Sequence, residues 1–301
     1  MDEQRPSQPV IGIFWMLVTG LCFISVTALV KYMGTALPPE QMAFLRYLLG
    51  LVFLLPAVTA LRETRLTRRQ WSFFGFRGLV HGLGVMSWFY AMTQIPIADV
   101  TAMNYMAPIY VTIGAALFLG ERLAFRRIAA VVAALIGALI ILRPGFREVS
   151  TGHLAMIFTA IAFGGSYLTA KVMAGEVKPS VVVAMLSIFV TMVLAPFAWA
   201  VWVTPSLNDL VLLFMVACFA TAGHYTMTLA FAAAPVTVTQ PVTFTQLIWA
   251  VLLGYFVFDE AVDIWVVIGG VIILASVSFI TWREAVLKRQ NRTPTLNETK
   301  V

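Results

Sequence analysis

The sequence predicts an all-α integral membrane protein with ten transmembrane helices, arranged as two inverted five-helix repeats around a central cavity. Composition predicts the membrane: 60% of the 301 residues are hydrophobic and only 11% are charged, whereas soluble domains are about a quarter charged. Similarity between the two halves of the chain predicts the repeats. A spanning helix takes about 20 residues, so ten spans use nearly the whole chain and we expect no separate soluble domain.

Apolar runs between charged residues, or between Pro and Gly breaks, give the ten spans. Two joints lack a polar loop, but each contains a proline, Pro96 or Pro235, and proline disfavours continuation of the preceding helix. The predicted spans are residues 10–32, 41–61, 71–93, 97–120, 126–143, 152–173, 180–203, 209–232, 236–258 and 262–282.

Basic residues distinguish the two sides of the predicted membrane. Fifteen Lys and Arg residues fall on the side of both termini, and two, Arg143 and Arg147, fall on the other, where Lys31 is arguably a third. Because Lys and Arg accumulate in cytoplasmic loops, we expect both termini in the cytoplasm. The net charge of +6 follows this loop pattern and not one amphipathic face, so it does not indicate a nucleic-acid partner.

The two halves of the chain match each other at a shift of 139 to 140 residues. The most informative matched pairs are Lys31–Lys171, Pro56–Pro196, Pro96–Pro235 and Glu121–Glu260. We therefore expect a first repeat over residues 1–145, a second over 150–284, and a cytosolic tail over 285–301. Five spans per repeat is an odd number, so the second repeat enters the membrane inverted, which is a recurrent architecture of transporters.

Two short motifs connect this pattern to a known family. They are Phe44-Leu45-Arg46-Tyr47 in the second span and Leu119-Gly120-Glu121 at the end of the fourth. With the five-plus-five repeat, they resemble the EamA-type branch of the drug/metabolite transporter superfamily, including its bacterial exporters of aromatic amino acids. The second repeat departs from the motifs, with Leu186 in place of Arg46 and Phe258-Asp259-Glu260 in place of the Leu-Gly-Glu ending.

The resemblance implies a function and a location. It implies a secondary transporter of the bacterial inner membrane that exports aromatic and other neutral amino acids, and related small metabolites, by alternating access. A drug or other metabolite exporter or facilitator of the same superfamily is the alternative. An integral-membrane enzyme is a weaker one, because no catalytic constellation is visible. The chain has no Walker A motif, so we expect no ATP, and we expect no cofactor and no metal.

Polar and aromatic residues at mid-span are candidates for a substrate site, because polar groups are costly in hydrocarbon. His81 and Trp88 share one helical face, and the repeat places His224 on the equivalent stripe. Pro108 and Pro241 are expected to interrupt the fourth and ninth spans. The alternative for each candidate is packing or interhelical hydrogen bonding. The predicted substrate-binding residues are His81, Trp88, Asn104, Phe163, Tyr167, His224, Thr243 and Gln246.

Three basic residues near span ends, Lys31, Arg46 and Lys171, are predicted to act in gating or electrostatic attraction of a substrate carboxylate. Snorkelling to the membrane surface is the alternative for the lysines, and a bond to a backbone carbonyl is the alternative for Arg46. Glu121 is expected to be a structural group at a helix end.

The acidic residues give an expectation about energy coupling. All fourteen fall in loops, tails or span ends, so we expect no proton relay through a buried carboxylate. No carboxylate is in register with His81, His153 or His224. Facilitated diffusion is therefore favoured, with proton exchange through His81 or His224 as the alternative.

Overall fold

The computed structural model describes residues 8–119, 125–146, 148–174, 176–234 and 236–290, and every regular element in these ranges is a helix. The first half forms α1 (Pro9–Met33), α2 (Pro39–Gly50), the 3-10 helix η1 (Leu51–Ala57), α3 (Val58–Glu63), α4 (Arg68–Gln94), α5 (Ile97–Asn104), α6 (Ala107–Leu119) and α7 (Phe125–Leu142). The second half forms α8 (Thr151–Ala174), α9 (Pro179–Ala200), α10 (Leu207–Ala233), α11 (Val236–Thr239), the 3-10 helix η2 (Gln240–Thr243), α12 (Phe244–Phe258) and α13 (Ile264–Gln290).

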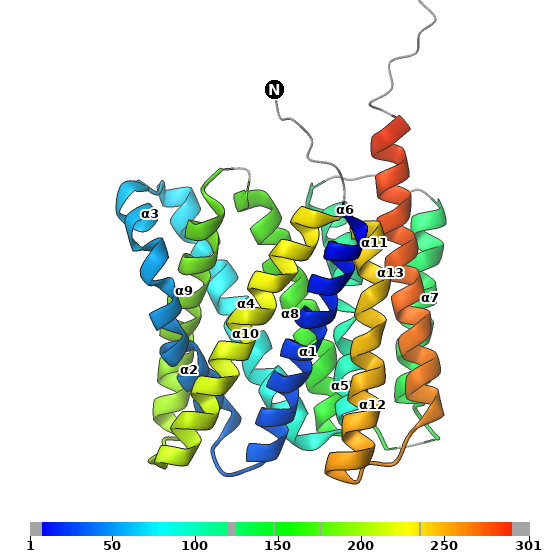
Figure 1. The fold of residues 1–301 in the computed structure, drawn as a ribbon, viewed down its shortest axis with the longest axis horizontal. Coiled ribbons are helices and arrows are strands. Elements are labelled where there is room, and N and C mark those ends of the chain that lie inside the picture. Colours follow the sequence, from blue (N-terminus) through cyan, green and yellow to red (C-terminus); the bar gives the residue numbers. More distant parts are fainter. Residues whose placement is uncertain (1–7, 120–124, 147, 175, 235, 291–301) are drawn as a thin grey trace, which may run out of the picture.

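The long helices stand side by side, and their connections gather at two opposite faces (Figure 1). We call the face where α1 begins and α13 ends the N-terminal face, and the opposite one the far face. The backbone N–H of Gln8 donates to the carbonyl of Ala233 at 2.9 Å, so α1 begins beside the end of α10. Lys31 Nζ donates to the carbonyl of Ile95 at 2.8 Å, so α1 ends beside the end of α4.

The start of α8 also lies at the far face, because a Cβ placed on Gly152 would lie 2.9 Å from the Cβ of Gln94. The first helix of the second half therefore runs opposite to α1, as inverted repeats require.

A repeated glycine contact also agrees with two equivalent halves. A Cβ on Gly84 would lie 3.0 Å from the Phe163 ring, and one on Gly223 would lie 3.3 Å from the Phe23 ring. The repeat alignment pairs Gly84 with Gly223 and Phe23 with Phe163, so one contact occurs twice.

Proline interrupts three of the predicted spans. Pro108 follows a break between α5 and α6, and Pro241 lies in η2, as predicted. A continuous helix over 41–61 is wrong: α2 gives way to η1, which contains Pro56, and then to α3. Proline has no N–H to continue the α-helical ladder. Its repeat counterpart Pro196 lies inside an unbroken α9.

Among the described residues, seven helical segments are long and apolar enough to cross a membrane: α1, α5 with α6, α7, α8, α9, α10 and α13. The other predicted spans correspond to α2–α3, to α4 and to α11–α12, so the count of ten stays a prediction. Large apolar side chains such as Phe118, Trp199 and Phe256 are exposed, which indicates contact with lipid.

The final helix extends beyond the predicted span. Its apolar, membrane-length part ends at Arg283, close to the predicted end at residue 282, and the helix continues to Gln290. Residues 284–290 include Glu, Ala, Leu, Lys, Arg and Gln, which are good helix formers. Residues 291–301 lie outside the described chain.

Candidate substrate cavity

A cavity of about 240 Å³ lies between helices of both halves, enclosed by α1, α2, α4, α5, α8, α10 and the η2–α12 segment. Breaks at the end of α5 and within η2 place polar side chains of those segments on its wall. Arg46 lines it as well. All eight residues predicted to bind substrate line it: His81, Trp88, Asn104, Phe163, Tyr167, His224, Thr243 and Gln246.

Aromatic rings form two walls of this cavity. On one wall the His81 ring stacks on Phe163, with centroids 4.8 Å apart and planes at 26°. Trp88 and Tyr167 extend this wall, with centroids 6.2 and 6.0 Å from that of Phe163. On the other wall Phe23 meets His224 edge to face at 5.1 Å. A flat ring between such walls gains stacking and apolar burial together.

The two cavity histidines have different surroundings. His81 is buried, and its ring nitrogens contact Ser166 Oγ at 3.0 Å and the Tyr47 hydroxyl at 3.1 Å. The imidazole of His224 forms no hydrogen bond with the described part of the chain. Tyr47 was not predicted as a cavity residue, although it directly follows Arg46 in the family motif. His81 is therefore a fixed part of the wall, whereas the imidazole nitrogens of His224 are available to a ligand.

Two buried polar atoms on the wall lack a hydrogen-bond partner within the described residues. They are the indole nitrogen of Trp88, which donates, and the side-chain oxygen of Asn104, which accepts. An unpaired buried polar group costs about 1–3 kcal/mol, so such groups call for an explanation. A bound polar molecule would satisfy both.

The charge of the wall is positive. Arg46 lines the cavity with its guanidinium 4.1 Å from the centroid of the Tyr47 ring. No Asp or Glu is among the described lining residues. Arg77, one turn from His81 on α4, was not predicted from the sequence. It is buried and donates to the carbonyl of Val182 at 3.0 Å, so its charge is held beside the wall.

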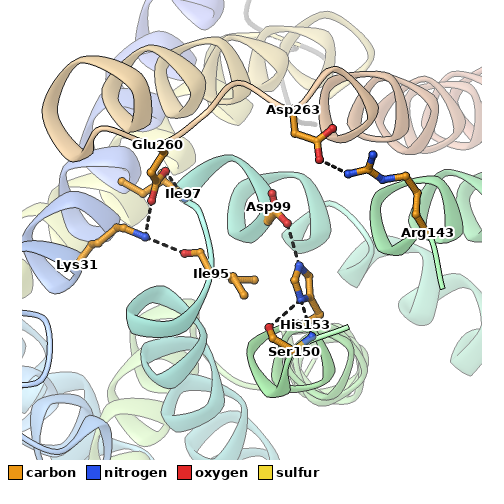
Figure 2. A network of polar contacts seen from close by, with 9 residues as sticks. All are labelled: Lys31, Ile95, Ile97, Asp99, Arg143, Ser150, His153, Glu260 and Asp263. Carbon is orange, nitrogen blue, oxygen red and sulfur yellow. Dashed lines mark hydrogen bonds and ion pairs between the residues drawn. The ribbon is translucent and has the colours of Figure 1, made fainter. Parts of the chain in front are cut away.

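Figure 2 shows a network of charged side chains at the far face. Lys31 forms an ion pair with Glu260, and these side chains are only 17% and 13% exposed. Glu260 also accepts the backbone N–H of Ile97 at 3.0 Å. Snorkelling of Lys31 is therefore wrong, because Glu260 and the carbonyl of Ile95 hold its ammonium inside the protein.

The same network contains a buried carboxylate that was not expected from the sequence. Asp99 Oδ2 lies 2.8 Å from Nε2 of His153, with side chains 2% and 5% exposed. The backbone N–H of Ser150 donates to Nδ1 of His153 at 3.2 Å, so the proton of this imidazole is on Nε2 and points to Asp99. Asp99 lies in the first turn of α5, at a span end as expected. What the sequence did not predict is that this carboxylate is buried and contacts His153.

A third pair, Arg143 with Asp263, completes the network. All three pairs connect the first half of the chain to the second. The N-terminal face has exposed connections, Arg69–Glu176 at 2.6 Å and Lys178–Glu63 at 3.2 Å. Hydrogen bonds from Arg69 and Gln70 lower the pKa of Glu176 below its usual value.

Two predicted residues fall outside the described side chains. They are the repeat counterparts of Lys31 and Glu260. Lys171 belongs to α8, but its side chain is not among those the structure describes, and Glu121 lies outside the described residues.

The cavity lies between the two faces. Its wall on α1 runs from Met16 to Thr27, seven residues after the helix begins at the N-terminal face and six residues before it ends at the far face. On α10 the wall extends to Phe231, two residues before the helix ends at the N-terminal face, and on α5 it begins at Val100, three residues after the helix begins at the far face. The far-face network borders the cavity, since Asp99 directly precedes Val100.

An apolar helical frame around a cavity shared by two inverted halves defines a multi-pass membrane transporter. The chain belongs to the EamA-like transporter family, whose sequence pattern matches residues 10–143 and 150–282. The drug/metabolite transporter superfamily expected from the motifs is thus confirmed.

Curated relatives match over nearly their full length. The chain is 30% identical to a riboflavin transporter of Rhizobium johnstonii, covering 96% of both chains. It is 29% identical to an S-adenosylmethionine uptake transporter of Rickettsia prowazekii, covering 91% of this chain and 93% of the relative. A pseudopaline exporter of Pseudomonas aeruginosa is 24% identical, covering 88% of this chain and 94% of the relative.

These names are those of transporters and not of enzymes, and none of the three is an aromatic amino acid exporter. Among solved structures, one crystal structure matches with a TM-score of 0.61 at 18% identity, covering 95% of this chain and 98% of the other. At that identity the match supports the shared fold alone.

Proposed function

We propose that this protein carries small ring-bearing metabolites, aromatic amino acids among them, across the bacterial inner membrane by alternating access. The observation that carries the proposal is a central cavity with aromatic walls and two buried, unpaired polar atoms, on Trp88 and Asn104. Ligand sites are typically apolar and aromatic with a few placed polar groups, which is the composition of this wall.

The ion pairs that join the two halves at the far face, beside a cavity that both halves line, support alternating access. In the proposed cycle, the described conformation is closed at the far face by the ion-pair network. Substrate exchanges at the N-terminal face, which we place in the cytoplasm. Opening at the other side requires the two repeats to separate where Lys31 meets Glu260 and Arg143 meets Asp263. Export is favoured by the family resemblance, whereas the relatives include both an uptake transporter and an exporter.

Purified protein in liposomes tests this function. Tritiated L-tryptophan, riboflavin and S-adenosylmethionine serve as three probes, each measured with and without an imposed pH gradient. We expect saturable movement of at least one ring-bearing probe down its gradient. Asp99, although at a span end, is a buried carboxylate in contact with His153, so the comparison with and without the pH gradient decides between facilitated diffusion and proton coupling.

A matched pair of variants assigns the movement to the cavity. Trp88→Phe keeps an aromatic ring and removes the unpaired N–H, whereas Trp199→Phe makes the same change at an exposed, lipid-facing position. We expect Trp88→Phe to weaken half-saturation by about tenfold, the scale of one hydrogen bond in a dry site, and Trp199→Phe to leave it unchanged. Equal behaviour of the two variants, or no transport of any probe, contradicts the proposal.

A further inference from the structure

Helices of both halves line the cavity, but the charge of its wall comes from the first half. Its lining contains one residue with a permanent charge, Arg46 on α2, and no carboxylate among the residues that the structure describes. The repeat alignment pairs Arg46 with Leu186, which is partly buried and packs against the main hydrophobic core. The wall therefore has a cationic group on one side only.

The guanidinium of Arg46 is held in place but not neutralised. It lies over the Tyr47 ring at 4.1 Å, and the Tyr47 hydroxyl is itself fixed by its contact with His81. Arg46 forms no hydrogen bond or ion pair with any described residue. An arginine carries five N–H donors in a planar fork that matches a carboxylate. A guanidinium facing a cavity without a partner is thus a ready anion site.

The other residues of the wall determine which chemical group a ligand can carry beside its anionic group. The rings of Trp88, Phe163 and Tyr167 on one side and of Phe23 and His224 on the other leave space for a flat, apolar group. A cationic ligand finds no acidic partner among the described lining residues, and Arg46 repels it. The aromatic rings offer it only cation–π attraction.

We propose that Arg46 determines substrate specificity by binding a carboxylate, so that the cavity selects ring-bearing molecules that carry a carboxylate over their uncharged or cationic analogues. This inference rests on the proposed function of the cavity. It predicts weak binding of S-adenosylmethionine, whose sulfonium and ammonium outweigh its single carboxylate, even though a relative takes up that compound.

The test measures binding of matched probes to the full-length protein in detergent by equilibrium dialysis. Indole-3-acetate and indole-3-acetamide share one ring and differ in the negative charge. For the wild type we expect at least about tenfold tighter binding of the acetate, the scale of a hydrogen bond to a charged group. Arg46→Gln is expected to lower acetate affinity to that of the acetamide. Arg46→Lys is expected to keep part of the preference, since it retains the charge but loses the fork.

Arg126→Ala is the matched control, because it removes a positive charge from the exposed start of α7, away from the cavity. It should bind both probes as the wild type does. A preserved acetate preference in Arg46→Gln, or none in the wild type, overturns the assignment. If the wild type binds acetamide or riboflavin but not acetate, Arg46 specificity fails while the proposed function stands. If it binds and transports none of the ring-bearing probes, both fail.

Discussion

At the scale of single residues, two Lys–Glu pairs connect the halves at opposite faces with very different burial. Lys31 and Glu260 are mostly enclosed, whereas Lys178 and Glu63 are 62% and 67% exposed. Removing one partner of a buried pair leaves the other charge uncompensated, whereas exposed pairs contribute about 0–1 kcal/mol because water screens them.

We therefore predict that Lys31→Ala lowers the free energy of unfolding by about 3 kcal/mol, the lower end for a buried pair because some water reaches it. Lys178→Ala should change it by less than about 1 kcal/mol. Thermal unfolding in detergent measures both. The double variant Lys31→Ala with Glu260→Gln should recover much of the loss, because no unpaired charge then remains. Equal midpoints for the two single variants would show that the burial of the far-face pair has no energetic consequence.

Residues of the cavity were easier to predict than residues of the network. His81 and Trp88 lie seven positions apart on one helix, so helical spacing alone places them on one face. The repeat then adds His224 and Thr243. Asp99 and His153 are 54 positions apart on different helices, and only tertiary packing brings them together. Arg77 was missed although it lies within a predicted span, where an ionisable residue is itself a signal.

At the scale of elements, helix packing across the halves depends on glycine. A Cβ on Gly84 would lie 3.0 Å from the Phe163 ring and 3.1 Å from the Cβ of Ala162, so α4 and α8 approach closely at the cavity wall. Gly165, also on α8, has no atom within 4 Å of an added Cβ. Glycine-to-alanine substitution can therefore be compared at a closely packed position, Gly84, and at a position with free space, Gly165.

We predict that Gly84→Ala lowers the unfolding midpoint, because strain of about 1–3 kcal/mol from overpacking exceeds the gain of up to about 1 kcal/mol in helix propensity. Gly165→Ala should leave the midpoint unchanged or raise it. Since the displaced ring belongs to Phe163, Gly84→Ala should also weaken probe binding, which the dialysis experiment measures. A Gly84→Ala protein as stable as Gly165→Ala would contradict the close approach of these helices.

Proline gave a good but incomplete guide to the elements. Breaks were predicted at Pro108 and Pro241 and occur in the structure. The same residue type has opposite outcomes at Pro56, which lies in a 3-10 helix, and at Pro196, which lies within α9. Neighbouring helices decide whether the freed carbonyl is tolerated, and a linear sequence does not contain that information.

At the scale of the whole molecule, the distribution of basic residues predicts the orientation of the protein in the membrane. The basic bias of fifteen to two places both termini in the cytoplasm. Alkaline phosphatase, which is active only outside the cytoplasm, should be inactive when fused after Lys300 and active when fused after Phe146 at the far face. The reverse pattern of phosphatase activity would show that the protein has the opposite orientation, with its N-terminal face outside the cytoplasm.

The composition of the sequence predicted a membrane protein, and the odd number of spans per repeat predicted the inverted arrangement of the two halves. Both are properties of the sequence as a whole. A low charged fraction needs lipid, and an odd number of spans per repeat forces inversion. The ion pairs at the far face could not be predicted in this way, because they depend on which partner each charged side chain finds after packing.

The doubled packing of Gly84 on Phe163 and of Gly223 on Phe23 has a consequence for the energy of the transport cycle. In the proposed cycle each half adopts the packing of the other, so that an interaction which breaks in one half forms again in the other. We therefore expect the two end states to be close in free energy. The relative populations of the two end states then depend on few interactions, and mainly on those that differ between the two halves. The enclosed pairs lie at the far face, and the exposed pairs Arg69–Glu176 and Lys178–Glu63 lie at the other. A difference of about 1.4 kcal/mol shifts such an equilibrium about tenfold. If the proposed cycle is correct, we expect a few side chains to determine which compartment the empty protein faces.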